Sequence, residues 1–217
     1  MYRIPRIDCN VACPASLEEA FARTVRETVA CNNWPADFPY APQVGFRIFH
    51  TGADLLLRFD VAERCTAART LDDNGPVWTD SCAEFFFRPE GSDSYYNFEC
   101  NCIGTLLVGH RRDRTQAEHA PAEVLRTVRR RATYPHAPLP ETEGDNRWTL
   151  TLAIPAAALF RDRIAGRDGV QGAMNLYKCG DDLSCPHYLS WRPVGTPAPD
   201  FHRPEFFEPV FFEPKKQ

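Results

Sequence analysis

Several short segments of the chain alternate between apolar and polar residues, as strands with one buried face do. The alternation runs through residues 44–49 and 55–61, and a Thr51-Gly52 turn between them predicts a β-hairpin. Residues 148–154 show it again, up to Pro155. A basic strand, expected at an edge or a solvent face, is predicted at 127–133. Further strands are predicted at 82–88, 95–104, 105–110, 173–178, 187–191 and 210–213.

A helical pattern precedes these strands. Ser16 to Glu19 match a capping box, in which two side chains satisfy each other's free backbone N–H groups. The apolar residues from Leu17 to Val29 then fall on one stripe at helical spacing. We therefore predict one amphipathic helix that begins at Ser16, ends before Asn32 and covers a sheet. A single helical turn is predicted at 121–125.

The composition favours an all-β fold. The 217 residues include 19 prolines and 12% aromatic residues, but only two methionines. These proportions are typical of many short strands joined by proline-bearing turns. We predict an antiparallel, jelly-roll-like β-sandwich that forms one domain over residues 1–217, with the helix-bearing segment 1–35 packed on it.

Charge and hydropathy exclude two classes of partner. Lys and Arg total 25 against 29 Asp and Glu, so the chain lacks the positive field that nucleic-acid binding needs. No segment approaches the roughly 18 continuous apolar residues of a membrane span. The first residues also lack the apolar region of a secretory signal, which predicts a cytoplasmic protein as given, or a periplasmic or extracellular one if a signal was removed. The sequence leaves the oligomeric state and the pairing of the nine cysteines open.

The predicted hairpin at residues 82–104 carries the most informative polar pattern. If Ala83, Phe85 and Phe87 face the core, the opposite face carries Glu84 on one strand and Asn97, Glu99 and Asn101 on the other. In the register that we assume, Glu84 lies across from Glu99. Opposed carboxylates destabilise each other unless a cation, a shared proton or a hydroxyl-rich ligand lies between them. The face is either a sugar-binding surface or an ordinary solvated sheet.

The four tryptophans are candidates for stacking on the apolar face of a sugar ring. Trp148 alternates with leucines, which predicts a core position. Trp34, Trp78 and Trp191 lie near prolines in turn-rich sequence and are either packing residues or ligand platforms.

Two other segments concentrate polar chemistry. Cys179, Cys185 and His187 offer three zinc ligands, or a cysteine nucleophile with a histidine base, but no fourth ligand and no cysteine-enzyme signature accompany them. A solvated polar loop is the simpler interpretation. Residues 200–207 either complete a pocket or hold the C-terminal tail. An arginine among residues 111–114 can pair with the Glu84 and Glu99 carboxylates.

The motifs at residues 77–86 and 95–104 resemble the central motifs of the bacterial carbohydrate-binding domains related to the family 9 xylan- and cellulose-binding modules. The similarity continues in order through residues 118–125, 148–150, 175–181, 186–191 and 199–202, and so covers the chain from about Trp34 onward. Cys100 and Cys185 depart from the pattern, in place of an aromatic and an aliphatic residue. The resemblance implies a β-sandwich with a sugar-binding face, structural calcium, and sugar chain ends held between tryptophans.

Our first hypothesis is a non-catalytic module for an oligosaccharide or polysaccharide of plant or microbial origin, used in carbohydrate catabolism. A tryptophan would stack on the sugar ring while polar side chains bond its hydroxyl groups, with roughly micromolar to millimolar affinity. The predicted carbohydrate-binding residues are Trp78, Asn97, Glu99, Asn101, Arg111, Lys178, Asp181, His187, Trp191, Asp200 and His202.

Two alternatives use the same polar face. In the first, the chain is a glycoside hydrolase with Glu84 and Glu99 as its carboxylate pair, since directly opposed strand neighbours suit the roughly 5 Å separation of a retaining enzyme. In the second, it is a structural interaction domain in which Glu84, Asn97, Glu99 and Asn101 supply oxygen ligands to calcium.

Overall fold

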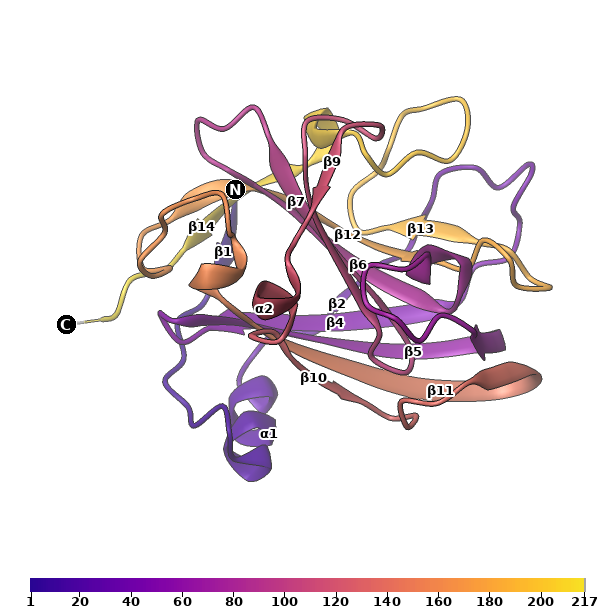
Figure 1. Cartoon of the computed structure of the whole chain (residues 1–217), viewed down its shortest axis with the longest axis horizontal. Helices are drawn as coiled ribbons and strands as arrows, with labels where there is room; N and C mark the ends of the chain where they lie inside the picture. The colour runs from indigo at the N-terminus through magenta and orange to yellow at the C-terminus, as the bar shows by residue number, and fades with distance from the viewer. Residues whose placement is uncertain (217) are drawn as a thin grey trace.

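The computed structural model describes residues 1–216 and folds them into two sheets packed face to face (Figure 1). The larger one, sheet A, has the order β1-β14-β12-β6-β7-β8-β9, with β13 joining β12 to β3, and sheet B has the order β10-β11-β5-β4-β2. The strands of sheet A are β1 (Tyr2–Ile4), β3 (Cys31–Asn32), β6 (Cys82–Pro89), β7 (Tyr95–Asn101), β8 (Leu106–Arg111), β9 (Ala117–His119), β12 (Gln171–Cys179), β13 (Tyr188–Ser190) and β14 (Glu208–Phe212). Those of sheet B are β2 (Glu27–Thr28), β4 (Gln43–His50), β5 (Asp54–Ala68), β10 (Arg129–Ala132) and β11 (Leu139–Pro155).

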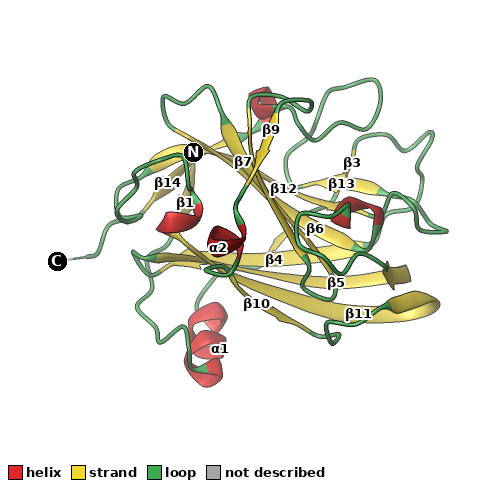
Figure 2. Cartoon of the chain, viewed as in Figure 1, coloured by secondary structure: helices red, strands yellow, loops and turns green. Residues whose placement is uncertain are grey.

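The prediction of a β-sandwich is confirmed (Figure 2). Strand β1 pairs with β14 in parallel, and the other named pairs are antiparallel. The alternating residues of both sheets meet in one buried core, where Phe85 and Phe98 of sheet A lie in the same cluster as Leu57 and Leu150 of sheet B. Trp148 also lies in this core, as its alternation with leucines predicted.

The strand predictions hold where the alternation is long. The hairpins β4–β5 and β6–β7 form as predicted, and the basic strand β10 lies at the edge of sheet B. Strands β1, β2, β3 and β9 were not predicted, since two or three residues are too short to display a period. Strand β11 begins at Leu139, well before the alternating segment, and pairs along β5 through two irregularities in register.

The N-terminal helix differs from its prediction. Helix α1 spans Pro14–Ala22, with Cys13 at its N-cap and no side-chain cap, so the predicted capping box at Ser16 is wrong. Pro14 begins the helix because its fixed φ and missing N–H suit the first turn. The helix ends early because Val29 donates its backbone N–H to Val44 and joins sheet B, while Val25 is exposed. The predicted turn at 121–125 is helix α2 (Ala122–Leu125).

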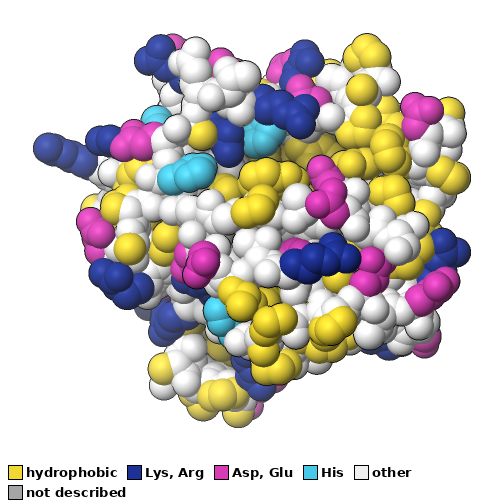
Figure 3. Space-filling view, turned by 45° about the vertical axis from the view of Figure 1, so that its right-hand side comes forward, with side chains coloured by type: hydrophobic (Ala, Val, Ile, Leu, Met, Phe, Trp, Pro, Cys, Tyr) yellow, Lys and Arg dark blue, Asp and Glu magenta, His cyan; other side chains and the backbone are white. Residues whose placement is uncertain are grey.

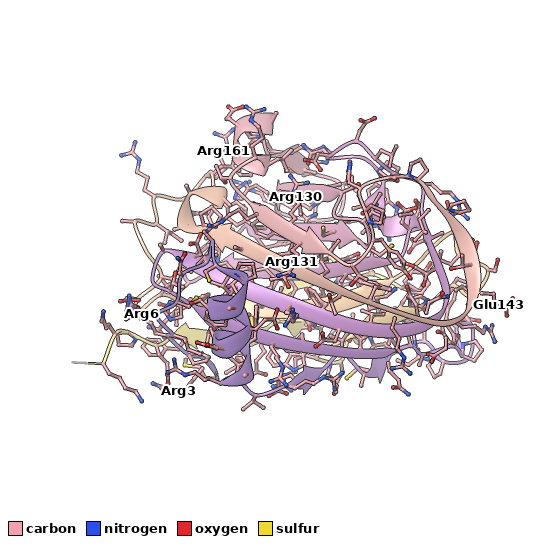
Figure 4. All side chains as sticks on the ribbon, turned by 90° about the horizontal axis from the view of Figure 1, so that it is seen from below. Arg3, Arg6, Arg130, Arg131, Glu143 and Arg161 are labelled. Carbon is pink, nitrogen blue, oxygen red and sulfur yellow. A yellow bond between two sulfur atoms is a disulfide. The ribbon has the colours of Figure 1, made fainter. Side chains whose placement is uncertain are left out.

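Helix α1 lies on the outer face of sheet B, seen from below in Figure 4, where Arg131 of β10 is labelled on the same side. Phe21 packs there against Phe49 with ring centroids 5.0 Å apart, in a cluster with Leu56 and Ala153. The helix therefore covers part of the outer face of sheet B. In residues 1–216, no helix has the length and apolar character needed to cross a membrane.

Candidate functional site

The outer face of sheet A is built by the residues that alternate away from the core on β6, β7 and β12. Phe86, Tyr95 and Tyr177 form an apolar layer on this face, together with Val77 and Phe207 from the loops above it. A 3₁₀ turn at Val77–Thr79 and the long segment between β13 and β14 rise beside this layer. The loops leave part of the sheet face uncovered.

A pocket of about 410 Å³ lies between these loops, within the size range of small-molecule sites. Figure 3 shows a hollow on this side of the molecule, where hydrophobic side chains lie recessed between basic and acidic ones. The pocket is lined by Phe38, Trp78, Glu84, Glu99, Arg111, Arg114, Cys179, Asp181, Tyr188, Pro199, Asp200, Phe201 and His202. These residues come from the sheet face and from at least four separate loops, so the site exists only in the folded chain.

Glu84 and Glu99 form the floor of the pocket. They are direct partners across β6 and β7, which confirms the register assumed from the sequence, and each is only 3% exposed. The solvated-face interpretation is therefore wrong. Burial and the opposed Glu99 raise the pKa of Glu84 well above its usual value, and burial raises the pKa of Glu99 to about 7. Protonated carboxyl groups both donate and accept hydrogen bonds, as a ligand rich in hydroxyls requires.

A chain of polar contacts fixes Glu99. Asn97 Nδ2 donates to Glu99 Oε1 at 2.7 Å, and Arg111 Nε donates to Asn97 Oδ1 at 2.9 Å. Arg111 also donates to the backbone oxygen of Arg114 at 3.0 Å, which ties the loop after β8 to the sheet. Asn97 thus lies beneath the pocket and orients two residues that line it. Arg111 is connected to the acid pair through the hydrogen bonds of Asn97.

Trp78 and Asp181 form one wall. The backbone N–H of Asp181 donates to the carbonyl oxygen of Trp78 at 3.2 Å, and this hydrogen bond joins the two loops. Trp78 is 38% exposed, which leaves its ring available to a ligand. Burial raises the pKa of Asp181 to about 6, with a further contribution from the neighbouring Asp182. A flat apolar ring beside a hydrogen-bonding carboxyl suits a sugar.

His202 and its neighbours form the opposite wall. His202 Nδ1 lies 3.0 Å from the hydroxyl of Tyr95, and burial together with Arg111 and Arg114 lowers the pKa of His202 to about 3. The ring is therefore neutral near pH 7. Phe201 stacks on Tyr177 with centroids 4.2 Å apart, and Asp200 Oδ1 accepts the backbone N–H of His202 at 3.1 Å.

The structure places four predicted sugar-binding residues away from the pocket. Trp191 is only 4% exposed and packs in the core against Tyr2 and Phe46, with centroids 5.0 and 5.6 Å away. The ring lies inside because Trp191 continues the alternation of β13, in which Leu189 also faces the core. The prediction of Trp191 as a stacking platform is therefore corrected, and Trp34 is buried as well.

The predictions for Lys178, His187 and Asn101 are also corrected, because these side chains lie inside the protein and away from the pocket. Lys178 alternates to the inner side of β12, where its Nζ lies 2.8 Å from Glu63 Oε2 and 2.7 Å from His187 Nε2. Asn101 Nδ2 donates to Asp80 at 2.9 Å and holds a loop rather than the pocket. Each side chain has its hydrogen-bonding capacity engaged inside the protein.

The predicted metal sets are not assembled. Asn101 is engaged with Asp80, and Asn97 with Glu99 and Arg111, so the four proposed calcium ligands do not converge on one point. The zinc set fails because Cys185 forms a disulfide with Cys65, their Cα atoms 6.0 Å apart, while His187 is bonded to Lys178. The remaining seven cysteines of the described residues are free thiols.

Sequence reasoning found about half of the lining. Trp78, Glu84, Glu99, Arg111, Asp181, Asp200 and His202 were predicted and line the pocket. Six lining residues were not among the predicted binding residues, namely Phe38, Arg114, Cys179, Tyr188, Pro199 and Phe201, although Arg114 and Phe201 lie in the candidate segments 111–114 and 200–207. The one available signal was the alternation in β12, where Cys179 shares the outer face with Tyr177.

Comparison with known proteins gives consistent matches. A family model described as carbohydrate-binding family 9 matches residues 13–212. The chain is similar to a candidate carbohydrate-binding protein from Bacteroides uniformis ATCC 8492, at 39% identity and a TM-score of 0.92, over 97% of this chain and 98% of that one. No match was found among curated proteins.

Two more distant structures share the fold. Both are family 9 carbohydrate-binding modules from Caldicellulosiruptor kristjanssonii, one in complex with glucose and one with cellotriose. The first is 8% identical, with a TM-score of 0.59 over 99% of this chain and 97% of that one. The second is 9% identical, with a TM-score of 0.57 over 99% and 94% of the two chains.

Proposed function

The chain belongs to carbohydrate-binding family 9, and from this premise we propose that the pocket on the outer face of sheet A binds a saccharide without cleaving it. The observation that carries the proposal is the lining itself. A partly exposed tryptophan ring lines the pocket together with two buried acids, a neutral histidine and an arginine. Stacking surface and hydrogen-bonding groups are arranged together as a pyranose requires.

Each part of the lining has a role in this proposal. Trp78 stacks on the apolar face of one sugar ring. Glu84, Glu99 and Asp181 bond its hydroxyl groups, and Arg111 and His202 close the other side. Since the two Caldicellulosiruptor modules hold glucose and cellotriose, glucose-type units are the first ligands to test. A role in polysaccharide catabolism follows from such a specificity.

The proposal assigns Glu84 and Glu99 to binding rather than to hydrolysis. A retaining hydrolase needs one ionised nucleophile beside one protonated acid. Here burial raises the pKa of both carboxyl groups, that of Glu99 to about 7, so below that pH neither is predominantly ionised as a nucleophile must be. Incubation with gluco-, xylo- and manno-oligosaccharides, followed by an assay for new reducing ends, is expected to detect no release. Release that Glu99→Gln abolishes would establish the hydrolase instead.

Calorimetric titration with the same oligosaccharides tests binding directly. We expect saturable heat with at least one of them, and a loss of about tenfold or more in affinity for Trp78→Ala, because the stacking surface is removed. Leu71→Ala is the matched control, since Leu71 is similarly exposed but does not line the pocket. Absence of heat with every oligosaccharide, or equal losses in both variants, would contradict the proposal.

A further inference from the structure

Two thiols and a carboxyl group meet at one side of the pocket floor. Cys82 and Cys179 are direct partners across β6 and β12, and both side chains alternate to the outer face. Glu84 follows Cys82 on the same face of β6. Ligand atoms of these three side chains lie within 4.8 Å of one another, and all three residues are buried. Strand pairing, rather than a flexible loop, holds them together.

Within residues 1–216, no salt bridge or hydrogen bond joins this cluster to a cationic side chain. Cys179 Sγ donates to Glu84 Oε1 at 3.0 Å, so a thiol is the hydrogen-bond partner of a buried acid. Lys178, the adjacent cation in the sequence, points to the other side of β12, where it pairs with Glu63 at 2.8 Å. Arg111 is bonded to Asn97 and to the backbone of Arg114. The cluster therefore consists of acidic groups that burial keeps protonated.

We propose that Cys82, Glu84 and Cys179 form a site for a thiophilic divalent cation of the zinc type. Binding releases the two thiol protons and the carboxyl proton to solvent, and the cation then sits among two thiolates and one carboxylate. Soft thiolate ligands select zinc-like ions over calcium and magnesium, which prefer oxygen ligands alone.

The geometry suits an open zinc site. Thiolate sulfur binds zinc at about 2.3 Å, which places tetrahedral ligands roughly 3.7 Å from each other, so small side-chain rotations bring the three groups into range. Glu84 and Cys179 line the pocket, and the fully buried Cys82 lies beside them on the same sheet face. The fourth position consequently faces the pocket, as in sites that hold a water molecule or a ligand atom.

Cobalt titration tests the site with a spectroscopic readout. Wild-type protein, purified under argon so that its free thiols stay reduced, is titrated with Co²⁺ and then with Zn²⁺. We expect a sulfur-to-cobalt charge-transfer band that saturates at one ion per chain and disappears when zinc is added. Cys82→Ser and Cys179→Ser should each lose at least half of the band. Glu84→Gln should retain it with affinity weakened by about tenfold or more.

The matched control is the double variant Cys9→Ser/Cys13→Ser, which removes two partly exposed thiols beside helix α1 and should leave the band unchanged. Circular dichroism and thermal unfolding check that each variant is folded. If a serine variant does not fold, Glu84→Gln still tests the site, because it keeps both thiols. Absence of the band in the wild type, its persistence in both serine variants, or its loss in the control would overturn the proposal.

This inference does not depend on saccharide binding. Calorimetry with oligosaccharides, run once with EDTA and once with Zn²⁺, separates the two proposals. A protein that shows the cobalt band but binds no saccharide in either condition would retain the metal site and lose the sugar-binding function.

Discussion

Glu84 and Glu99 face each other across β6 and β7 as buried neighbours beneath the pocket. Two ionised carboxylates at such positions repel each other and lose their hydration, so the pair favours at least one proton. This proton makes the floor of the pocket a donor as well as an acceptor. The same arrangement makes the protein less stable in alkaline solution, which can be measured.

The first prediction concerns the pH dependence of stability. The folded chain holds the Glu99 proton up to a pKa of about 7, whereas the unfolded chain releases it near the ordinary pKa of 4.5. The folded state binds more protons between these values, so the free energy of unfolding falls as pH rises through this window, by about 3 kcal/mol. Urea denaturation at several pH values should show this fall in the wild type and a smaller one in Glu99→Gln.

The control for this experiment is Glu143→Gln, which removes an exposed carboxylate on β11. It should keep the pH dependence of the wild type. Identical pH profiles for wild type and Glu99→Gln would show that the pair is solvated and ionised in the folded protein.

The second prediction separates the two tryptophans that sequence reasoning treated alike. Trp191→Ala should lower the free energy of unfolding by about 3–5 kcal/mol, because the ring fills the core beside Tyr2 and Phe46. Trp78→Ala should change it by about 0.5 kcal/mol or less, since the ring is partly exposed. Chemical denaturation followed by far-UV circular dichroism measures both. A larger loss for Trp78→Ala would reverse the assignment.

Alternation along strands made the sheet face predictable. The period of two in residues 82–101 placed Phe85, Phe87 and Phe98 inside and Glu84 and Glu99 together outside, because a one-residue slip would have buried the opposite set. The loops carry no such period. Phe201 reaches the pocket through a loop whose geometry depends on tertiary contacts, such as the stacking of Phe201 on Tyr177.

Lys178 shows why a residue's usual preference misleads. Lysine is rarely buried, so a place among solvent-facing ligands was the natural expectation. Its neighbours Tyr177 and Cys179 occupy the outer face, however, and alternation sends Lys178 inward. Only the fold brings Glu63 of β5 to meet it. The predicted helix was too long for a similar reason. Residues Glu27 and Thr28 pair with β4, and this strand pairing overrides the helical spacing of the sequence.

The third prediction concerns this buried ion pair. Lys178→Met should lower the free energy of unfolding by about 3–5 kcal/mol, because it leaves the Glu63 carboxylate buried with only neutral donors, the Trp148 N–H and the Thr66 hydroxyl, bonded to it. The double variant Glu63→Gln/Lys178→Met should recover part of that loss, since no unpaired charge remains. Urea denaturation of the three proteins measures it, and a double variant less stable than Lys178→Met would contradict the argument.

Glu63 also predicts an acid limit for stability. Burial alone would raise its pKa, but the charge and hydrogen bonds of Lys178, with help from His187 and Trp148, outweigh burial and lower it. A lowered pKa in the folded state gives stability that is present above the unfolded value near 4.5 and is lost as pH falls through the folded value. The wild type should thus lose stability below about pH 4.5 more steeply than the double variant does.

The last prediction uses a glycine to test the support of the pocket. A Cβ at Gly109 of β8 would lie 2.6 Å from Asn97 Oδ1 and 3.2 Å from Arg111 Nε, so Gly109→Ala must displace a buried amide. We expect a loss of about 1–3 kcal/mol in stability and at least about fivefold weaker saccharide binding, because Asn97 orients both Glu99 and Arg111.

Gly45→Ala is its matched control on β4. The added methyl group would meet the guanidinium of Arg26, whose exposed side chain can move into solvent, so stability and binding should stay close to wild type. Calorimetry and thermal unfolding of the two variants decide the matter. If Gly109→Ala binds saccharide as tightly as Gly45→Ala does, the Asn97 contacts are dispensable, and the acids of the pocket floor hold their positions through strand pairing alone.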